Sequence, residues 1–145
     1  MVEILIKAWR VKMKNLEGKS FTFSWKIDSE EFLWRSNEEV FSLHLLATSG
    51  MMEIVFRASF NLLKPLMEPG VTTVVSWASV EHLSPVPYGA TIHGKFYIEK
   101  ATDRYVDFLC EVYDHLEKVG VIRFRRVLVS LNYLRRKANE KTAEL

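Results

Sequence analysis

Two side chains suited to acid–base chemistry stand beside the predicted ends of secondary-structure elements. Thr48 comes at the start of a long helix predicted over residues 49–63, and His82 lies near the end of a β-branched run. Histidine exchanges protons near neutral pH, and a hydroxyl beside the free N–H groups of a helix start is well placed to react or to donate. Taken alone, Thr48 is also an ordinary helix-capping residue type, and His82 an ordinary structural histidine. Both interpretations stay open on residue type alone.

Glu53 is the candidate carboxylate on the same predicted helix. It precedes Arg57 by four residues, the order and spacing of an exposed ion pair, so a catalytic role for Glu53 is the alternative to a structural one. The other histidines, His44, His93 and His115, lack the spacing of metal ligands, and we expect no metal site.

Hydrophobic periodicity predicts the elements that position these side chains. One face of residues 20–27 is apolar with a period of two, as in a half-buried strand. Residues 49–63 are apolar over most of a helix circumference, which is typical of a helix wrapped by other structure. Four further strands are predicted at about residues 71–83, 91–100, 106–112 and 121–134.

Short connections between the last four strands predict antiparallel neighbours, and the helix is the only element large enough to cover their apolar face. We therefore expect an α+β fold in which an antiparallel sheet wraps around one long central helix. This order of elements fits the hot-dog fold, although periodicity alone allows other α+β arrangements. The prediction is one domain over residues 1–145, with an N-terminal extension at 1–18 and a frayed tail at 138–145.

Composition narrows the class of partner. The chain has 145 residues and a net charge of +2, from 20 basic and 18 acidic residues, so nothing demands a nucleic acid. No apolar run is long enough to span a bilayer, and the first residues lack the apolar centre of a secretory signal. The single cysteine, Cys110, cannot form an internal disulfide. We expect a cytoplasmic protein with no membrane partner.

Three segments between about residues 45 and 137 resemble the thioesterase superfamily of hot-dog proteins, in the branch typified by fluoroacetyl-CoA thioesterase. Residues 46–52 (Leu-Ala-Thr-Ser-Gly-Met-Met) look like the family's opening of the central helix. Residues 80–89 (Val-Glu-His-Leu-Ser-Pro-Val-Pro-Tyr-Gly) are similar to its His-Leu-x-Pro-x-Pro-x-Gly turn, the most specific of the three. Gly120 and residues 126–129 (Arg-Val-Leu-Val) resemble its closing strand.

The resemblance implies an acyl-coenzyme A thioester as substrate or ligand, no required cofactor, and a homodimer with its pocket at the subunit interface. Thr48 would stand at the family's catalytic threonine and His82 at its catalytic histidine, while Glu53 is a possible substitute acid. Phe56 occupies the position of the family's glutamate and Val75 that of a glycine, so both are expected to line the substrate pocket.

These departures leave two functions open. The first is hydrolysis of an acyl-CoA by Thr48 and His82. The second is a non-catalytic acyl-CoA binding or sensing protein that has lost the family's glutamate. The basic residues of the C-terminal region, Arg126 among them, either solvate the surface or attract the phosphates of coenzyme A.

Overall fold

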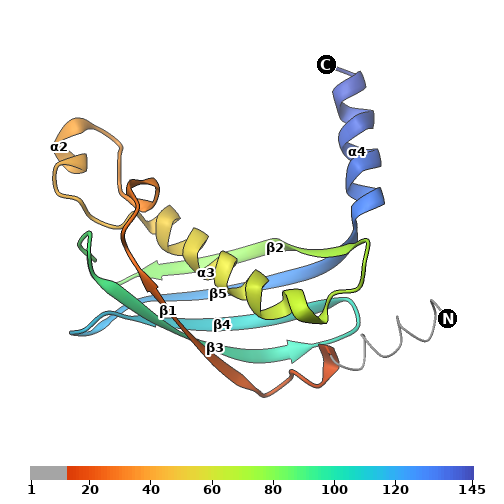
Figure 1. Cartoon of the computed structure of the whole chain (residues 1–145), viewed down its shortest axis with the longest axis horizontal. Coiled ribbons are helices and arrows are strands. Elements are labelled where there is room, and N and C mark those ends of the chain that lie inside the picture. The colour runs from red at the N-terminus through yellow and green to blue at the C-terminus, as the bar shows by residue number, and fades with distance from the viewer. Residues whose placement is uncertain (1–12) are drawn as a thin grey trace.

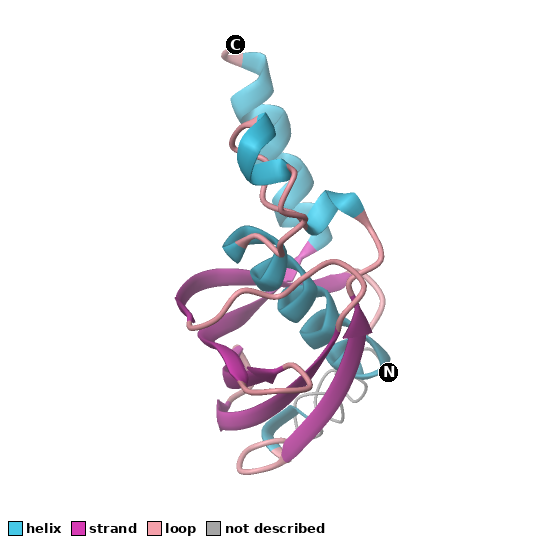
Figure 2. Cartoon of the chain, turned by 90° about the vertical axis from the view of Figure 1, so that its left-hand side faces the viewer, coloured by secondary structure: helices cyan, strands magenta, loops and turns pink. Residues whose placement is uncertain are grey.

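A computed structural model gives the fold and describes residues 13–145. Five antiparallel strands form one sheet, and the long helix α3 (Thr48–Leu63) lies against its concave side (Figure 1). The strands are β1 (Ser20–Lys26), β2 (Val71–His82), β3 (Thr91–Ala101), β4 (Tyr105–Tyr113) and β5 (Lys118–Ser130), in the spatial order β1-β3-β4-β5-β2. The view of Figure 2 shows how the sheet curls around the helix. The predicted order of strand, central helix and four strands is confirmed.

Three phenylalanines from neighbouring strands form the centre of the core beneath α3. Phe108 and Phe124 stack with their ring centroids 4.8 Å apart, and Phe96 meets Phe108 edge to face at 5.4 Å. Burial of each such side chain contributes about 1.5–3 kcal/mol. The helix supplies the other half of this core with a buried face that includes Met51, Ile54, Val55 and Leu63.

Strand β1 closes over the core because β3 has a glycine at the point of contact. The ring of Phe23 stacks on Phe96 at 5.1 Å, and a Cβ on Gly94 would lie only 2.0 Å from that ring. The alternation predicted over residues 20–27 is therefore the packing of one face of β1 against the sheet interior.

Three short helices lie at the ends of the main elements. They are η1 (Glu30–Phe32) and α2 (Glu38–Phe41) within the charge-rich segment before α3, and η2 (Lys64–Leu66) directly after α3. No helix is predicted from the sequence in that segment. In the predicted N-terminal extension, residues 1–12 lie outside the described part of the chain, whereas Met13 and Leu16 are buried in the core.

The last strand is shorter than predicted. β5 ends at Ser130, and residues Leu131–Ala143 form helix α4, whereas the sequence predicted a strand to about residue 134 and a frayed tail at 138–145. The Ser130 hydroxyl accepts a hydrogen bond from the Tyr133 N–H at 3.0 Å and so caps the helix. Beyond Val129 the β-branched residues give way to good helix formers, which the strand prediction overlooked. Helix α4 projects away from the sheet (Figure 1).

No helix within residues 13–145 is both long and apolar enough to cross a bilayer.

Candidate active site

Thr48 is the first residue of α3, and its hydroxyl is not used to cap the helix. The capping position belongs to Ala47, which has extended backbone angles and no side-chain hydrogen bond. The segment before the helix is fixed by its backbone, since the Leu46 N–H donates to Val86 O at 2.8 Å and the Ala47 N–H to Phe32 O at 2.9 Å. The Thr48 hydroxyl is therefore held in place and free for another partner.

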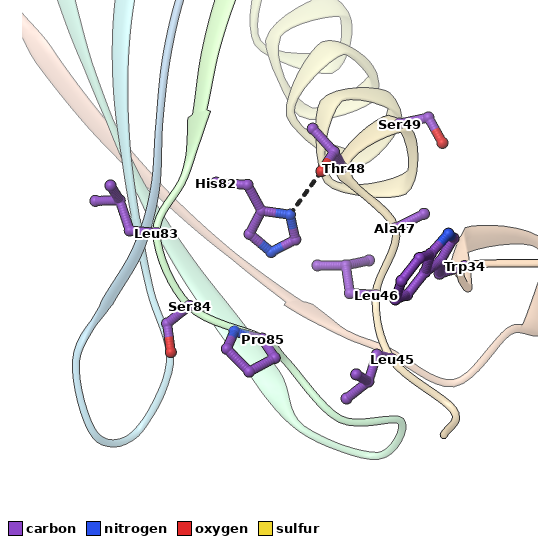
Figure 3. Close-up of a pocket in the computed structure, with 10 residues that line it drawn as sticks. All are labelled: Trp34, Leu45, Leu46, Ala47, Thr48, Ser49, His82, Leu83, Ser84 and Pro85. Atoms are coloured by element: carbon purple, nitrogen blue, oxygen red, sulfur yellow. Dashed lines mark hydrogen bonds between the residues drawn. The ribbon is translucent and has the colours of Figure 1, made fainter. Parts of the chain in front are cut away.

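That partner is His82, the last residue of β2. Thr48 Oγ1 lies 2.8 Å from His82 Nδ1, as Figure 3 shows. The second ring nitrogen of His82, Nε2, is buried and has no hydrogen-bond partner within the described chain. Nδ1 is therefore engaged by the Thr48 hydroxyl, whereas Nε2 remains able to make one further hydrogen bond.

Two glycines allow the start of α3 to pack closely on its neighbours, η1 on one side and the β2–β5 pair on the other. A Cβ on Gly50 would lie 2.1 Å from the backbone oxygen of Phe32, so the first turn of α3 packs directly on the η1 backbone. Gly120 pairs with His82 in the β2–β5 register, and a Cβ there would lie 2.6 Å from the sulfur of Met51. The Gly120 contact places Met51 of α3 against the strand paired with His82, and the Gly50 contact fixes the same helix start on η1.

A cavity of about 530 Å³ opens beside this pair. Figure 3 shows the side chains around it, which are Trp34, Leu45, Leu46, Ala47, Thr48, Ser49, His82, Leu83, Ser84 and Pro85. Six of these ten are apolar, and none is a carboxylate, a lysine or an arginine. Cavities of this size commonly hold small-molecule ligands.

The first turn of α3 adds backbone donors to the cavity. The first intrahelical hydrogen bond runs from the Met51 N–H to Ala47 O at 2.9 Å, so the N–H groups before Met51 have no acceptor within the helix. Ser49, whose side chain lines the cavity, is one of the residues that carry such a group. Donors at a helix start favour a negatively charged oxygen.

Glu53, proposed as a substitute acid, lies outside this cavity and is held in an ion-pair network. Arg57 Nε donates to Glu53 Oε1 at 2.8 Å, and Arg57 also reaches Glu31 at 3.3 Å. The predicted i, i+4 ion pair is therefore present. Glu53 and Phe56 instead line a separate cavity of about 340 Å³, to which Trp25 and Arg126 also contribute.

Phe56 and Val75, predicted to line the pocket, are both used in packing. The Phe56 ring meets Phe124 edge to face with centroids 5.1 Å apart, and Val75 packs against the core. Neither contributes to the lining of the cavity beside Thr48 and His82.

Arg126 is buried beneath α3, so it neither solvates the surface nor is exposed to attract the phosphates of coenzyme A. Only 5% of its surface is exposed, and its guanidinium donates to Phe56 O at 2.6 Å, to Ser59 Oγ at 2.7 Å and to both oxygens of Thr73. Burial lowers its pKa to about 10. Its neighbour on β5, Arg125, donates twice to Asp107, so both guanidinium groups have partners within the chain.

Trp34 and Ser49 line the cavity but were not singled out in the sequence. Ser49 follows Thr48 directly, so its proximity could have been foreseen. Trp34 lies in a charge-rich segment without periodicity, and it reaches the cavity through the bridge between Leu33 and Leu46. Within residues 13–145 no group of three or more His, Cys, Asp or Glu side chains is placed to hold a metal ion.

The geometry can be compared with known proteins. The profile of the fluoroacetyl-CoA-specific thioesterase family, FlK, matches residues 27–132. The chain belongs to this family. A search of curated proteins found no match.

Solved structures agree on the fold. A hot-dog-like protein from Thermanaerovibrio acidaminovorans is 16% identical with a TM-score of 0.77, covering 89% of this chain and 96% of its own. The fluoroacetyl-CoA thioesterase FlK itself is 19% identical with a TM-score of 0.77, covering 86% and 96%. A thioesterase superfamily member from Thermus thermophilus is 22% identical with a TM-score of 0.75, covering 89% and 96%. The predicted hot-dog fold is confirmed.

Variants of FlK have been crystallised with fluoroacetate and CoA and with acetyl-CoA. These ligands belong to that protein.

Proposed function

We propose that this protein hydrolyses an acyl-coenzyme A thioester in the cavity beside Thr48 and His82. The observation that carries the proposal is the 2.8 Å contact between the Thr48 hydroxyl and His82 Nδ1 at the start of α3. Membership of a thioesterase family supports the substrate class.

The parts of the cavity match the needs of the reaction. Thioester hydrolysis needs a group that moves protons near neutral pH, an activated oxygen nucleophile, and donors for the oxyanion that forms on the carbonyl. His82 serves as the proton carrier. Thr48 serves either as the nucleophile or as a donor, and the free N–H groups at the start of α3 stabilise the oxyanion. No metal ion or organic cofactor is needed for these steps.

The test is release of free thiol from a panel of acyl-CoA thioesters, followed beside a thermal-shift assay with the same compounds. Replacement of His82 by alanine is expected to abolish the release without unfolding the protein. His93→Ala is a matched control, because His93 Nδ1 also lies 2.8 Å from a hydroxyl, that of Ser24, but outside the cavity. Equal loss in both variants, or no release by the folded parent protein, would sink the proposal.

The second candidate function is acyl-CoA binding or sensing without turnover. It is favoured by Phe56 at the family's glutamate position and by the lack of any carboxylate in the lining of the cavity. Thermal stabilisation by acyl-CoA without thiol release would establish this function instead.

We further propose a homodimer in the cytoplasm, with the ligand pocket at the subunit interface. Strand β2 lies at one edge of the sheet and carries Trp77, which is 46% exposed, so a second copy has an unpaired strand and an apolar side chain to contact. Light scattering during size-exclusion chromatography tests the dimer, and Trp77→Glu should shift it toward monomer. Cell fractionation tests the location, for which the support is the single free cysteine.

A further inference from the structure

We infer that the site selects an acyl group with a plain apolar chain longer than acetyl, and that it disfavours a chain with a polar or charged end. This inference rests on the proposed function, because it names the acyl group that the same cavity takes. It follows from how the polar atoms around the cavity are distributed.

Two polar groups of the lining are already occupied. The indole N–H of Trp34 donates to Ser36 Oγ at 2.8 Å, so the ring presents only its apolar surface to the cavity. The Ser84 hydroxyl donates to the carboxylate of Glu117. Neither group is therefore free to bind a polar substituent on a ligand without breaking an existing bond.

The remaining polar groups gather around the reacting pair. Thr48, Ser49 and His82 lie near the start of α3, whereas Trp34 and Leu83 form walls on either side of them (Figure 3). A thioester carbonyl placed at Thr48 thus meets the hydroxyl, the imidazole and the helix N–H groups. An acyl chain that extends from that carbonyl along Trp34 or Leu83 contacts apolar side-chain atoms.

The walls are partly exposed although they are apolar. Trp34 is 42% exposed and Leu83 is 51% exposed. Large exposed apolar side chains beside one cavity indicate a surface that a ligand, or the second copy proposed above, covers. An apolar chain longer than acetyl would bury more of both residues than an acetyl group does.

The volume agrees with a longer chain. Each molecule of liquid water occupies about 30 Å³, so a cavity of about 530 Å³ has room for many more heavy atoms than the three of an acetyl group. The thiol arm of coenzyme A takes part of this space, and a chain of several carbons fills the rest. No cation lines the cavity to pair with a charged chain end.

The experiment is a chain-length series, in which kcat/KM is measured for acetyl-, butyryl-, hexanoyl- and octanoyl-CoA. We expect kcat/KM to rise about fourfold for each added methylene until the cavity is full. Adipoyl-CoA has the length of hexanoyl-CoA but ends in a carboxylate. Its kcat/KM is expected to be at least tenfold lower than that of hexanoyl-CoA. Highest activity with acetyl-CoA, or equal activity with adipoyl- and hexanoyl-CoA, would overturn the inference.

Leu83→Asp tests the wall directly. It is expected to flatten the dependence of kcat/KM on chain length, with the largest loss for octanoyl-CoA. The matched control is Leu116→Asp, because Leu116 is 78% exposed and lies outside the lining. A control variant that flattens the series as much as Leu83→Asp would count against the assignment.

Failure of the inference can be told apart from failure of the proposed function. If no thioester is hydrolysed, the proposed hydrolysis is wrong. The Kd values of the same thioesters, measured by calorimetry, then test the apolar site on their own. Affinity that rises with chain length and drops for adipoyl-CoA would still support the apolar site, whereas affinity independent of the acyl group would overturn it.

Discussion

The first turn of α3 rests on the backbone of η1 at a single point, where Gly50 faces Phe32. A Cβ at position 50 would lie 2.1 Å from the Phe32 oxygen, and that same oxygen accepts a hydrogen bond from the Ala47 N–H. Contact and hydrogen bond together fix the residues on both sides of Thr48. The position of Thr48, the candidate nucleophile, therefore depends on the lack of a side chain at Gly50, two residues further along the helix.

Gly50→Ala is expected to destabilise the protein and to weaken its activity. The added methyl group must push α3 away from Phe32, and overpacking of this kind costs about 1–3 kcal/mol. Urea unfolding measures the free energy, and thiol release measures the activity. Asn61→Ala, on the exposed face of the same helix, serves as the control and should change the unfolding free energy by less than about 0.5 kcal/mol. Unchanged stability of Gly50→Ala would contradict the described contact.

Thr48→Val keeps the shape of the side chain but removes its hydroxyl. His82 Nδ1 then loses the one hydrogen bond that it makes within residues 13–145, and thiol release is expected to fall at least tenfold, equivalent to about 1.4 kcal/mol of barrier. Thr48→Ser restores the hydroxyl and should retain most of the activity. Equal activity of the valine and serine variants would show that the hydroxyl takes no part in the reaction.

The sequence predicted the main elements because each has a clear period and a clear stop. The resemblance also predicted that Thr48 and His82 belong to one site, and the structure brings them within hydrogen-bond distance. The place of Trp34 in the lining of the cavity was not predictable in this way. Trp34 reaches it only through a bridge between two residues far apart in the chain, Leu33 and Leu46, which no local pattern encodes.

Phe56 and Val75 were assigned to the pocket from matching family positions, and Glu53 from its place three residues before Phe56 on the same helix, neither of which gives a side-chain direction. Those directions depend on packing partners elsewhere in the chain. Phe124 draws the Phe56 ring into the core, and Arg57 holds the Glu53 carboxylate outside the cavity. The end of β5 was mispredicted for a local reason, since the cap at Ser130 decides where the helix α4 begins.

Cys110 is expected to be unreactive in the native protein. Burial raises the pKa of its thiol to about 12, because the thiolate would lose its hydration. Between pH 9 and 12 the unfolded chain gives up this proton while the native protein keeps it, so the thiol lowers stability as pH rises through that range. A disulfide reagent at pH 8 should label the native protein at least a hundredfold more slowly than the protein unfolded in guanidinium chloride. Rapid labelling of the native state would show that strand β4 opens.

Arg126→Met is expected to destabilise the protein by more than about 2 kcal/mol. The guanidinium satisfies acceptors on both α3 and β2, including Phe56 O and Ser59 Oγ, and methionine fills similar space but leaves these oxygens with fewer donors. Arg123, on the same strand, is exposed and forms a surface ion pair with Glu99 at 3.4 Å. Arg123→Met is therefore the matched control, with an expected change within about 0.5 kcal/mol. Equal effects of the two variants in urea unfolding would mean that the buried arginine contributes no more to stability than a surface ion pair.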